Sequence, residues 1–184
     1  MNAVNQQERL SIDERRNWFL AGFIEGEGSV CVSIKEHRCG KFGYLIDPEF
    51  FIYQHKNRKE SLEHARRVFG TGRIYPKSGN PDVLVFAIDS RKSLIERVIP
   101  FLNRYTVFSS KLSDYEKFKK IVMALENKEH WTKEGMIRIV RLAYMMNMEG
   151  KQRKRNIQEV IDRILRDYTP DAAIKRDEDI VRTS

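Results

Sequence analysis

The spacing of hydrophobic and polar residues predicts alternating helices and strands in the N-terminal half of the chain. A capping box at Ser11 to Glu14 would start a helix that runs to about Glu25, where Gly26 and Gly28 would end it. In residues 29–35, apolar side chains occupy every second position, which is typical of a strand with one buried face. The pattern then predicts a strand, a helix, a two-stranded hairpin and another helix. These elements are expected at residues 44–54, 58–69, 73–77, 82–89 and 90–99.

Three further helical stretches follow this α-β-β-α-β-β-α order, at residues 110–127, 132–148 and 152–168. We therefore expect an α+β fold with extra helices at its C-terminal end. The chain divides into a flexible lead-in, a core, a C-terminal helical extension and a polar tail. These parts correspond to residues 1–10, 11–127, 128–169 and 170–184.

The net charge of the chain narrows the class of binding partner. The 184 residues carry a formal net charge of +8, and 41% of them are hydrophobic, enough for one core. This excess of positive charge favours a polyanionic partner, either nucleic acid or an anionic membrane surface. A basic protein that is merely well solvated is the alternative.

Cysteine and histidine spacing argues against several other classes. Cys31 and Cys39 form no C-x-x-C pair, and the four histidines are scattered, so no zinc site is indicated. No apolar run is long enough to span a membrane, and residues 1–9 lack the pattern of a signal or transit peptide. We expect a protein of the cytoplasm, or of an organelle that encodes it, with no membrane partner.

One face of the first helix carries small residues. Trp18, Gly22 and Gly26 follow one another at intervals of four residues, which places them on the same side of a helix. Glycines spaced in this way let a second helix approach closely, at a cost of about 1 kcal/mol for each interior glycine. This face is therefore expected to pack against another helix.

Two acidic residues lie where a helix tolerates them least. Glu25 and Glu27 come at the expected C-terminal end, which carries about half a negative charge. Pairing two such helices would bring the acids together, and a divalent cation with carboxylate and carbonyl ligands, including the Gly26 carbonyl, would relieve the repulsion. The alternative is that the acids are solvated and that the glycines only end the helix.

The segment Leu20-Ala21-Gly22-Phe23-Ile24-Glu25-Gly26-Glu27-Gly28 resembles the LAGLIDADG motif of the LAGLIDADG homing endonucleases. Leu20, Ala21, Gly22, Ile24 and Gly28 match the motif, and the two glutamates replace its aspartates. The element order over about residues 12–125 is that of the same family. The resemblance implies a four-stranded antiparallel sheet that forms a saddle on the DNA major groove.

For the site, the resemblance implies that Glu27 binds the catalytic metals together with the Gly26 carbonyl. A chain with one motif resembles the members that form homodimers through the motif helices, here through Trp18, Ala21, Gly22, Glu25 and Gly26. Gln54 resembles the polar residue that orients water, Arg58 a basic group near the scissile phosphate, and Lys111 the basic residue that stabilises the transition state.

The activity implied is site-specific hydrolysis of double-stranded DNA at a long pseudo-palindromic target, across the minor groove, leaving short 3′ overhangs. The expected cofactor is Mg²⁺, with Ca²⁺ or Mn²⁺ as substitutes in binding or catalysis. Two alternatives keep the same fold: an RNA-binding intron maturase, with intron RNA as partner, and a DNA-binding regulator that no longer cuts.

Strand pairs fit the DNA major groove, so the alternating strand positions that carry polar side chains are the expected DNA contacts. The alternate positions, which carry apolar side chains and include Val83 and Val85, are expected in the core. The nominated contacts are Ser33, Lys35, His37, Arg38, Lys41, Tyr44, Arg73, Tyr75, Lys77 and Asp82.

Overall fold

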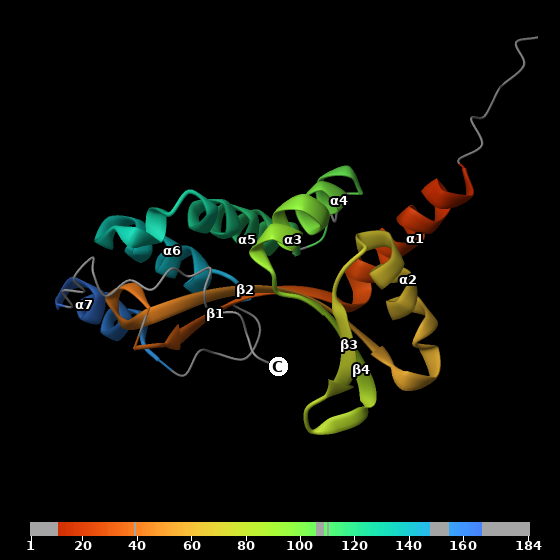
Figure 1. Cartoon of the computed structure of the whole chain (residues 1–184), viewed down its shortest axis with the longest axis horizontal. Coiled ribbons are helices and arrows are strands. Elements are labelled where there is room, and N and C mark those ends of the chain that lie inside the picture. Colours follow the sequence, from red (N-terminus) through yellow and green to blue (C-terminus); the bar gives the residue numbers. More distant parts are fainter. Residues whose placement is uncertain (1–10, 39, 106–108, 110, 148–154, 167–184) are drawn as a thin grey trace, which may run out of the picture.

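A computed structural model describes residues 11–38, 40–105, 109, 111–147 and 155–166. The expected lead-in at 1–10 and tail at 170–184 lie outside the described residues. Figure 1 shows a curved sheet with α3, α4, α5 and α6 on one of its faces. The elements are α1 (Ile12–Glu27), β1 (Gly28–Glu36), η1 (Lys41–Gly43), β2 (Tyr44–His55), η2 (Lys56–Arg58), α2 (Glu60–Phe69), β3 (Arg73–Lys77), β4 (Asn80–Ile88), α3 (Arg91–Ser93), η3 (Leu94–Val98), α4 (Ile99–Arg104), α5 (Lys111–Glu126), η4 (Glu129–Trp131), α6 (Lys133–Tyr144) and α7 (Ile157–Arg166).

The sheet is antiparallel, with four strands in the order β1-β2-β4-β3. In the pairing of β1 with β2, Gly28 lies opposite Ile52. In the pairing of β2 with β4, Phe50 lies opposite Ile88. The expected α+β fold with a four-stranded antiparallel sheet is confirmed.

One face of the sheet forms the core together with the helices. Phe50 and Ile52 of β2 and Phe86 of β4 are fully buried there, against Leu20 of α1 and Phe118 of α5. Burial of each large apolar side chain contributes about 1.5–3 kcal/mol to the free energy of folding. The opposite face is called the outer face below. Its residues include Ser29, Cys31, Ser33 and Lys35 of β1, Glu49, Phe51 and Tyr53 of β2, Arg73 and Tyr75 of β3, and Val85 and Ala87 of β4.

The first helix is longer than expected. It continues through Gly26 and ends at Glu27, and β1 begins at the next residue. The cap is Gly28, whose backbone N–H donates to the Ile24 carbonyl while its own backbone is already extended. A Cβ at Gly28 would lie 2.5 Å from that carbonyl oxygen, so this sharp passage from helix to strand requires glycine.

Val85 was expected on the core face of the hairpin, and this expectation is wrong. Its cross-strand partners are Tyr53 and Tyr75, which places it on the outer face, and by the same alternation Val83 shares that face. The core residues of β4 are the intervening Leu84, Phe86 and Ile88. The apolar run 83–88 occupies both parities, so alternation alone could not set its phase.

The helix expected at 90–99 also continues past its expected end. Pro100 sits in the first turn of α4, directly after the π-helical turn η3. A proline in the first turn of an α-helix needs no backbone N–H, which explains why the helix does not stop there.

The later helices pack beside the sheet. Thr132 caps α6 through a hydrogen bond from the Gly135 amide, 3.1 Å. At the far end of β1, Glu36 pairs with Arg155 at 2.8 Å and with Arg163 of α7 at 2.6 Å, which ties this helix to the tip of the sheet. In the part of the chain that the structure describes, every helix is too short or too polar to cross a membrane.

Candidate active site

The inner side of α1 is fixed to the rest of the fold. Leu20 and Ile24 lie in the core, and the Tyr105 hydroxyl donates to Glu14 at 2.8 Å. Asn17 donates to the same hydroxyl at 3.1 Å. These contacts place the end of α1, and the exposed side chain of Glu27, at the start of β1.

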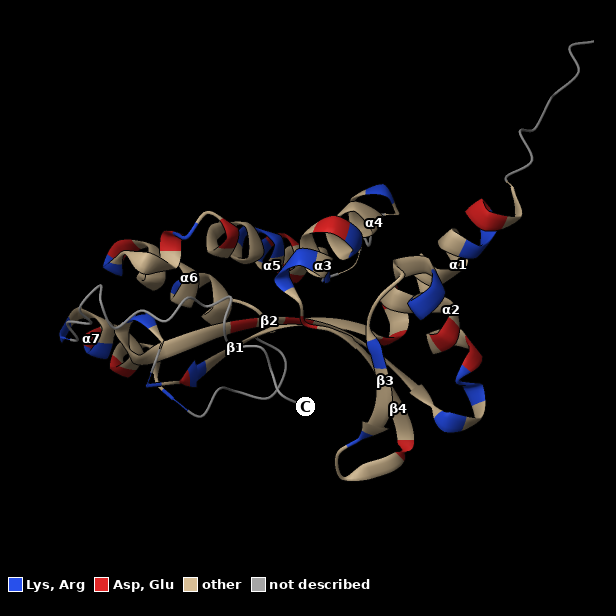
Figure 2. Cartoon of the chain, in the orientation of Figure 1, with Lys and Arg blue, Asp and Glu red and all other residues tan. Residues whose placement is uncertain are grey.

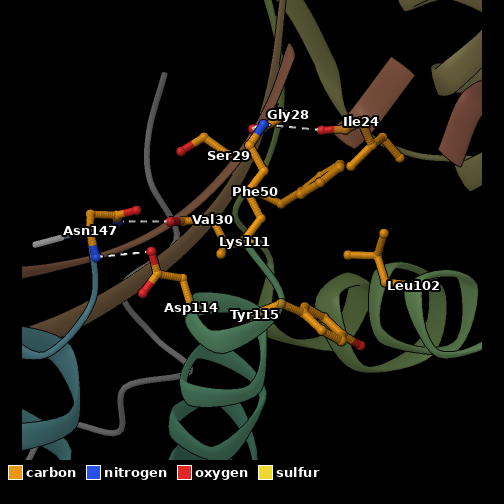
Figure 3. A pocket seen from close by; sticks show the side chains of 10 residues that line it. All are labelled: Ile24, Gly28, Ser29, Val30, Phe50, Leu102, Lys111, Asp114, Tyr115 and Asn147. Atoms are coloured by element: carbon orange, nitrogen blue, oxygen red, sulfur yellow. Dashed lines mark hydrogen bonds between the residues drawn. The ribbon is translucent and has the colours of Figure 1, made fainter. Parts of the chain in front are cut away.

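Lys111 reaches the same helix end from α5. Its Nζ donates to the carbonyl oxygens of Gly28 at 2.8 Å and Gly26 at 3.2 Å, and it lies 3.5 Å from that of Ile24. An ammonium group is favoured there because the last carbonyls of a helix carry partial negative charge. Figure 3 shows Lys111 beside Gly28. The structure thus brings three expected site residues, Gly26, Glu27 and Lys111, to one place.

A second contact beside this place was not anticipated from sequence. Asn147, after α6, donates its side-chain amide to the Val30 carbonyl at 3.1 Å and its backbone N–H to Asp114 at 3.1 Å (Figure 3). Asn147 adopts the left-handed conformation, φ 52°, which asparagine tolerates better than most residues. The contact fixes edge strand β1 close to Lys111, and no local sequence signal would have revealed it.

The two other expected catalytic residues lie at the end of β2 and just after it. Gln54 is two residues beyond Ile52, the partner of Gly28, and it is half-buried. Its Oε1 accepts a hydrogen bond from the His55 amide at 2.7 Å. Arg58 is exposed in η2 rather than in α2, which begins at Glu60.

The oxygen donors at the end of α1 suit a hard divalent cation. They are the Glu27 carboxylate and the Gly26 carbonyl, and neighbouring backbone carbonyls add negative potential. Among the described residues, no group of three or more His, Cys, Asp or Glu side chains could hold a metal ion.

The outer side of α1 is open and partly apolar. A Cβ at Gly22 or Gly26 would meet nothing within 4 Å. Phe19 is 60% exposed on this side, and Trp18 is 47% exposed while packing edge-on against Tyr105. Four of the residues expected on the motif-helix interface are thus at least partly accessible, namely Trp18, Gly22, Glu25 and Gly26.

Ala21 does not lie on this open side of α1. It is 6% exposed and belongs to the core of its own protomer, so its expected place on the helix interface is wrong. The physical reason is the position of Ala21 around the axis of the helix. Ala21 is one residue from Leu20 and three from Ile24, both of which face inward.

The nominated DNA contacts divide into accessible and buried residues. Arg38 and Tyr75 are exposed, and Ser33, His37 and Lys41 are half-buried. Tyr44 is 4% exposed, and the Arg163 guanidinium lies over its ring at 5.3 Å. Tyr44 is therefore a core residue, and its assignment to a DNA-contacting loop is wrong.

Four nominated residues already have charged or aromatic partners. Lys35 pairs with Asp47 and Arg73 with Asp89, each at 2.6 Å, and the Lys77 ammonium lies 5.1 Å from the Tyr53 ring. Asp82 pairs with Lys56 at 2.6 Å, and this hydrogen bond and charge lower the pKa of Asp82. Figure 2 shows lysines and arginines on several elements around the sheet.

Comparison with known proteins decides the family. A sequence model described as LAGLIDADG endonuclease matches residues 20–122, from the first residue of the nonapeptide to a point within α5. The chain belongs to the LAGLIDADG endonuclease family. The resemblance of residues 20–28 to the LAGLIDADG motif is thereby confirmed.

Relatives within the LAGLIDADG family are similar in sequence and in fold. DNA endonuclease I-CeuI of Chlamydomonas moewusii is 42% identical over 135 residues, which cover 72% of this chain and 62% of that protein. A structure of intron-encoded I-CeuI complexed with DNA has a TM-score of 0.78 and 34% identity, and covers 85% of this chain and 79% of that one.

Two further LAGLIDADG structures extend the comparison. The archaeal intron-encoded I-Vdi141I, complexed with DNA, has a TM-score of 0.76 at 35% identity and covers 83% of this chain and 96% of that one. I-SmaMI, bound to uncleaved DNA in the presence of calcium ions, has a TM-score of 0.72 at 28% identity and covers 84% of this chain and 49% of that one. The fold of this chain is thus that of LAGLIDADG homing endonucleases.

Proposed function

We propose that this protein is a homing endonuclease that hydrolyses both strands of a specific DNA site, as a homodimer and with a divalent metal ion. The observation that carries the proposal is the meeting of Lys111 with the end of α1, where its Nζ lies 3.2 Å from the Gly26 carbonyl, next to Glu27. An acid and a carbonyl at one helix end can hold a divalent cation, and a lysine beside them can offset the charge that develops on a phosphate during hydrolysis.

Each group has a role in this proposal. Glu27 and the Gly26 carbonyl would hold the cation, which when bound lowers the pKa of water and offsets charge on the phosphate. Lys111 would stabilise the charge that develops on the phosphate oxygens. Gln54 would orient the attacking water, and the exposed Arg58 would contact the backbone nearby. The structure of I-SmaMI in the presence of calcium ions supports divalent-cation binding, and Mg²⁺ is the proposed catalytic ion.

The open side of α1 supports the homodimer. Gly22 and Gly26 leave room for a second helix, and the exposed ring of Phe19 would lose contact with water on association. Two copies would bring both Glu27 carboxylates close to one duplex, which would allow one cut in each strand. The target would then have two related halves, and short 3′ overhangs would follow from cutting across the minor groove.

DNA binding is supported by the charge of +8 and by the DNA complexes of I-CeuI and I-Vdi141I. Arg38, Lys41 and the outer face would lie against the major groove. We expect the protein to act in the compartment that holds its target, either the cytoplasm or an organelle.

The test is cleavage selection from a randomised duplex library with Mg²⁺ at low salt. We expect cut molecules with a shared sequence at their ends from the natural protein and none from Glu27→Gln. The matched control is Glu126→Gln, since Glu126 is also the exposed last residue of a 16-residue helix, and it should cut normally. If the natural protein yields no cut species, the nuclease proposal fails. Binding without cutting would instead favour a regulator, and preference for intron RNA a maturase.

A further inference from the structure

Five apolar or aromatic side chains gather on the outer face of the sheet. This apolar patch consists of Phe51, Tyr53, Tyr75, Val85 and Ala87. The register places Phe51 opposite Ala87, and both Tyr53 and Tyr75 opposite Val85. Partners in an antiparallel pair share a face, so the five side chains form one continuous surface on the side away from the helical core.

Ring and electrostatic contacts agree with this grouping. The rings of Phe51 and Tyr53 have centroids 6.0 Å apart. Burial raises the pKa of Tyr53, and so do the nearby Cys31, Tyr75 and Glu49, which lie on the same face. Val85 is 4% exposed and Ala87 2% exposed, and neither belongs to the hydrophobic core cluster on the other face of the sheet.

The patch reaches the surface and has a basic margin. Tyr75 is 39% exposed, and Phe51 and Tyr53 are half-buried. The Lys77 ammonium lies 5.1 Å from the Tyr53 ring, and Arg73, whose guanidinium pairs with Asp89, is the cross-strand partner of Ala87. Apolar surface bordered by basic side chains suits a ligand that is apolar at one point and anionic around it.

The position of the patch is close to the proposed cleavage site. Phe51 lies opposite Ser29, which is the second residue of β1. Ser29 is only two residues from Glu27 along the chain. Base pairs that touch the patch would therefore belong to the inner part of each half-site, nearest the cut.

The edges of DNA bases differ in their fit to such a surface. In the major groove, the 5-methyl group of thymine is the apolar feature, whereas the other base edges present hydrogen-bond donors and acceptors. An apolar surface would leave those polar groups without partners, which is unfavourable, and would exclude water from a methyl group, which is favourable.

We propose that the apolar patch selects thymine at inner positions of each half-site through contact of its 5-methyl group with the accessible rings of Phe51, Tyr53 and Tyr75, beside which Val85 and Ala87 are buried. This inference rests on the proposed binding of DNA. It adds a specificity determinant that hydrogen bonding does not supply.

The experiment compares thymine with uracil, which differs only in lacking the methyl group. Duplexes are first selected by binding in Ca²⁺, without cleavage, and sequenced. The selected duplex is then prepared with uracil at the inner thymines, or at outer thymines as the positional control. We expect a loss in affinity of about fourfold for each inner methyl removed, corresponding to about 0.8 kcal/mol, and little loss at outer positions.

Two variants of Tyr75 separate ring contact from hydrogen bonding. Tyr75→Ser should remove most of the thymine–uracil difference assigned to its position, whereas Tyr75→Phe should retain it, because the ring remains. Arg73→Ala is the matched control on the same strand. It should weaken binding of thymine and uracil duplexes equally, because a guanidinium would contact phosphate rather than methyl groups.

The outcomes distinguish this inference from the proposed function. If no duplex is selected, DNA binding itself fails. If duplexes are selected but inner positions lack thymine, or uracil binds as well as thymine there, the patch serves only to pair the strands and the inference is overturned. Loss of the difference in Tyr75→Phe would also overturn it, since the hydroxyl would then be the reading group.

Discussion

Replacing Lys111 by methionine tests whether its ammonium stabilises the end of α1. The side chain keeps a similar length but loses the charge that contacts the carbonyls of Gly28 at 2.8 Å and Gly26 at 3.2 Å. A hydrogen bond from a charged group contributes about 1.5–3 kcal/mol, and a cation at a helix C-terminus about 0.3–2 kcal/mol, and the two overlap here because they describe one contact. We therefore expect a loss of about 2 kcal/mol in the free energy of unfolding.

Thermal unfolding measures this loss. For a chain of this length, about 2–4 °C of Tm accompanies each kcal/mol, so Lys111→Met should lower Tm by about 4–8 °C. Amide hydrogen exchange at Gly28 should also quicken, because its N–H donates to the Ile24 carbonyl at the same helix end. The variant should bind DNA and fail to cut it.

Lys120→Met is the control, since Lys120 is an exposed lysine of the same helix. Its Tm should stay within about 1–2 °C of the natural protein, as expected for a surface substitution. Equal Tm values for the two variants would refute the reasoning, because the contact of Lys111 with α1 would then contribute nothing to stability.

Four further changes have defined outcomes. Glu27→Gln should abolish cutting and leave Ca²⁺-supported binding largely intact in a gel-shift assay, and surviving activity would rule out this acid as the metal ligand. Gly22→Leu should keep the protomer folded, because nothing lies within 4 Å of its Cβ, but should shift sedimentation toward monomer; an unchanged dimer would exclude this face as the interface. Arg38→Ala should reduce the slope of log affinity against log salt by about one, and an unaltered slope would mean no phosphate contact. Burial raises the pKa of Tyr115, so stability should be complete below the unfolded pKa of about 10 and fall as pH rises beyond it; in urea unfolding Tyr115→Phe should show a smaller alkaline loss.

Much of α1 was predictable because helical periodicity is local. The four-residue spacing of Gly22 and Gly26 gave their shared face, and the structure leaves both open. The same spacing could not show that the helix continues to Glu27, because glycine both ends helices and occurs inside them. Ala21 was misassigned since a small residue suits a helix interface and a protein core alike.

Features that depend on contacts between distant segments of the chain were harder to predict from the sequence. The contact of Lys111 with Gly26 joins residues 85 positions apart, and only the family resemblance suggested it. Tyr44 was misassigned because Arg163, on a helix near the other end of the chain, covers its ring. The outer-face position of Tyr53 was missed because β2 is apolar at most positions, so its two faces look alike in sequence.

The direct succession of Glu27 and Gly28 would couple cutting to base recognition in the proposed nuclease. With no linker between α1 and β1, the backbone of Glu27 has a fixed position relative to the strands of the sheet. Insertion of a single residue at this junction would exchange the two faces of β1 relative to the acid, because side chains alternate at each position. In the proposed nuclease, the interval between the cut and the bases that the sheet contacts would therefore be set by the fold, and a new target would be reached by changing side chains on the strands.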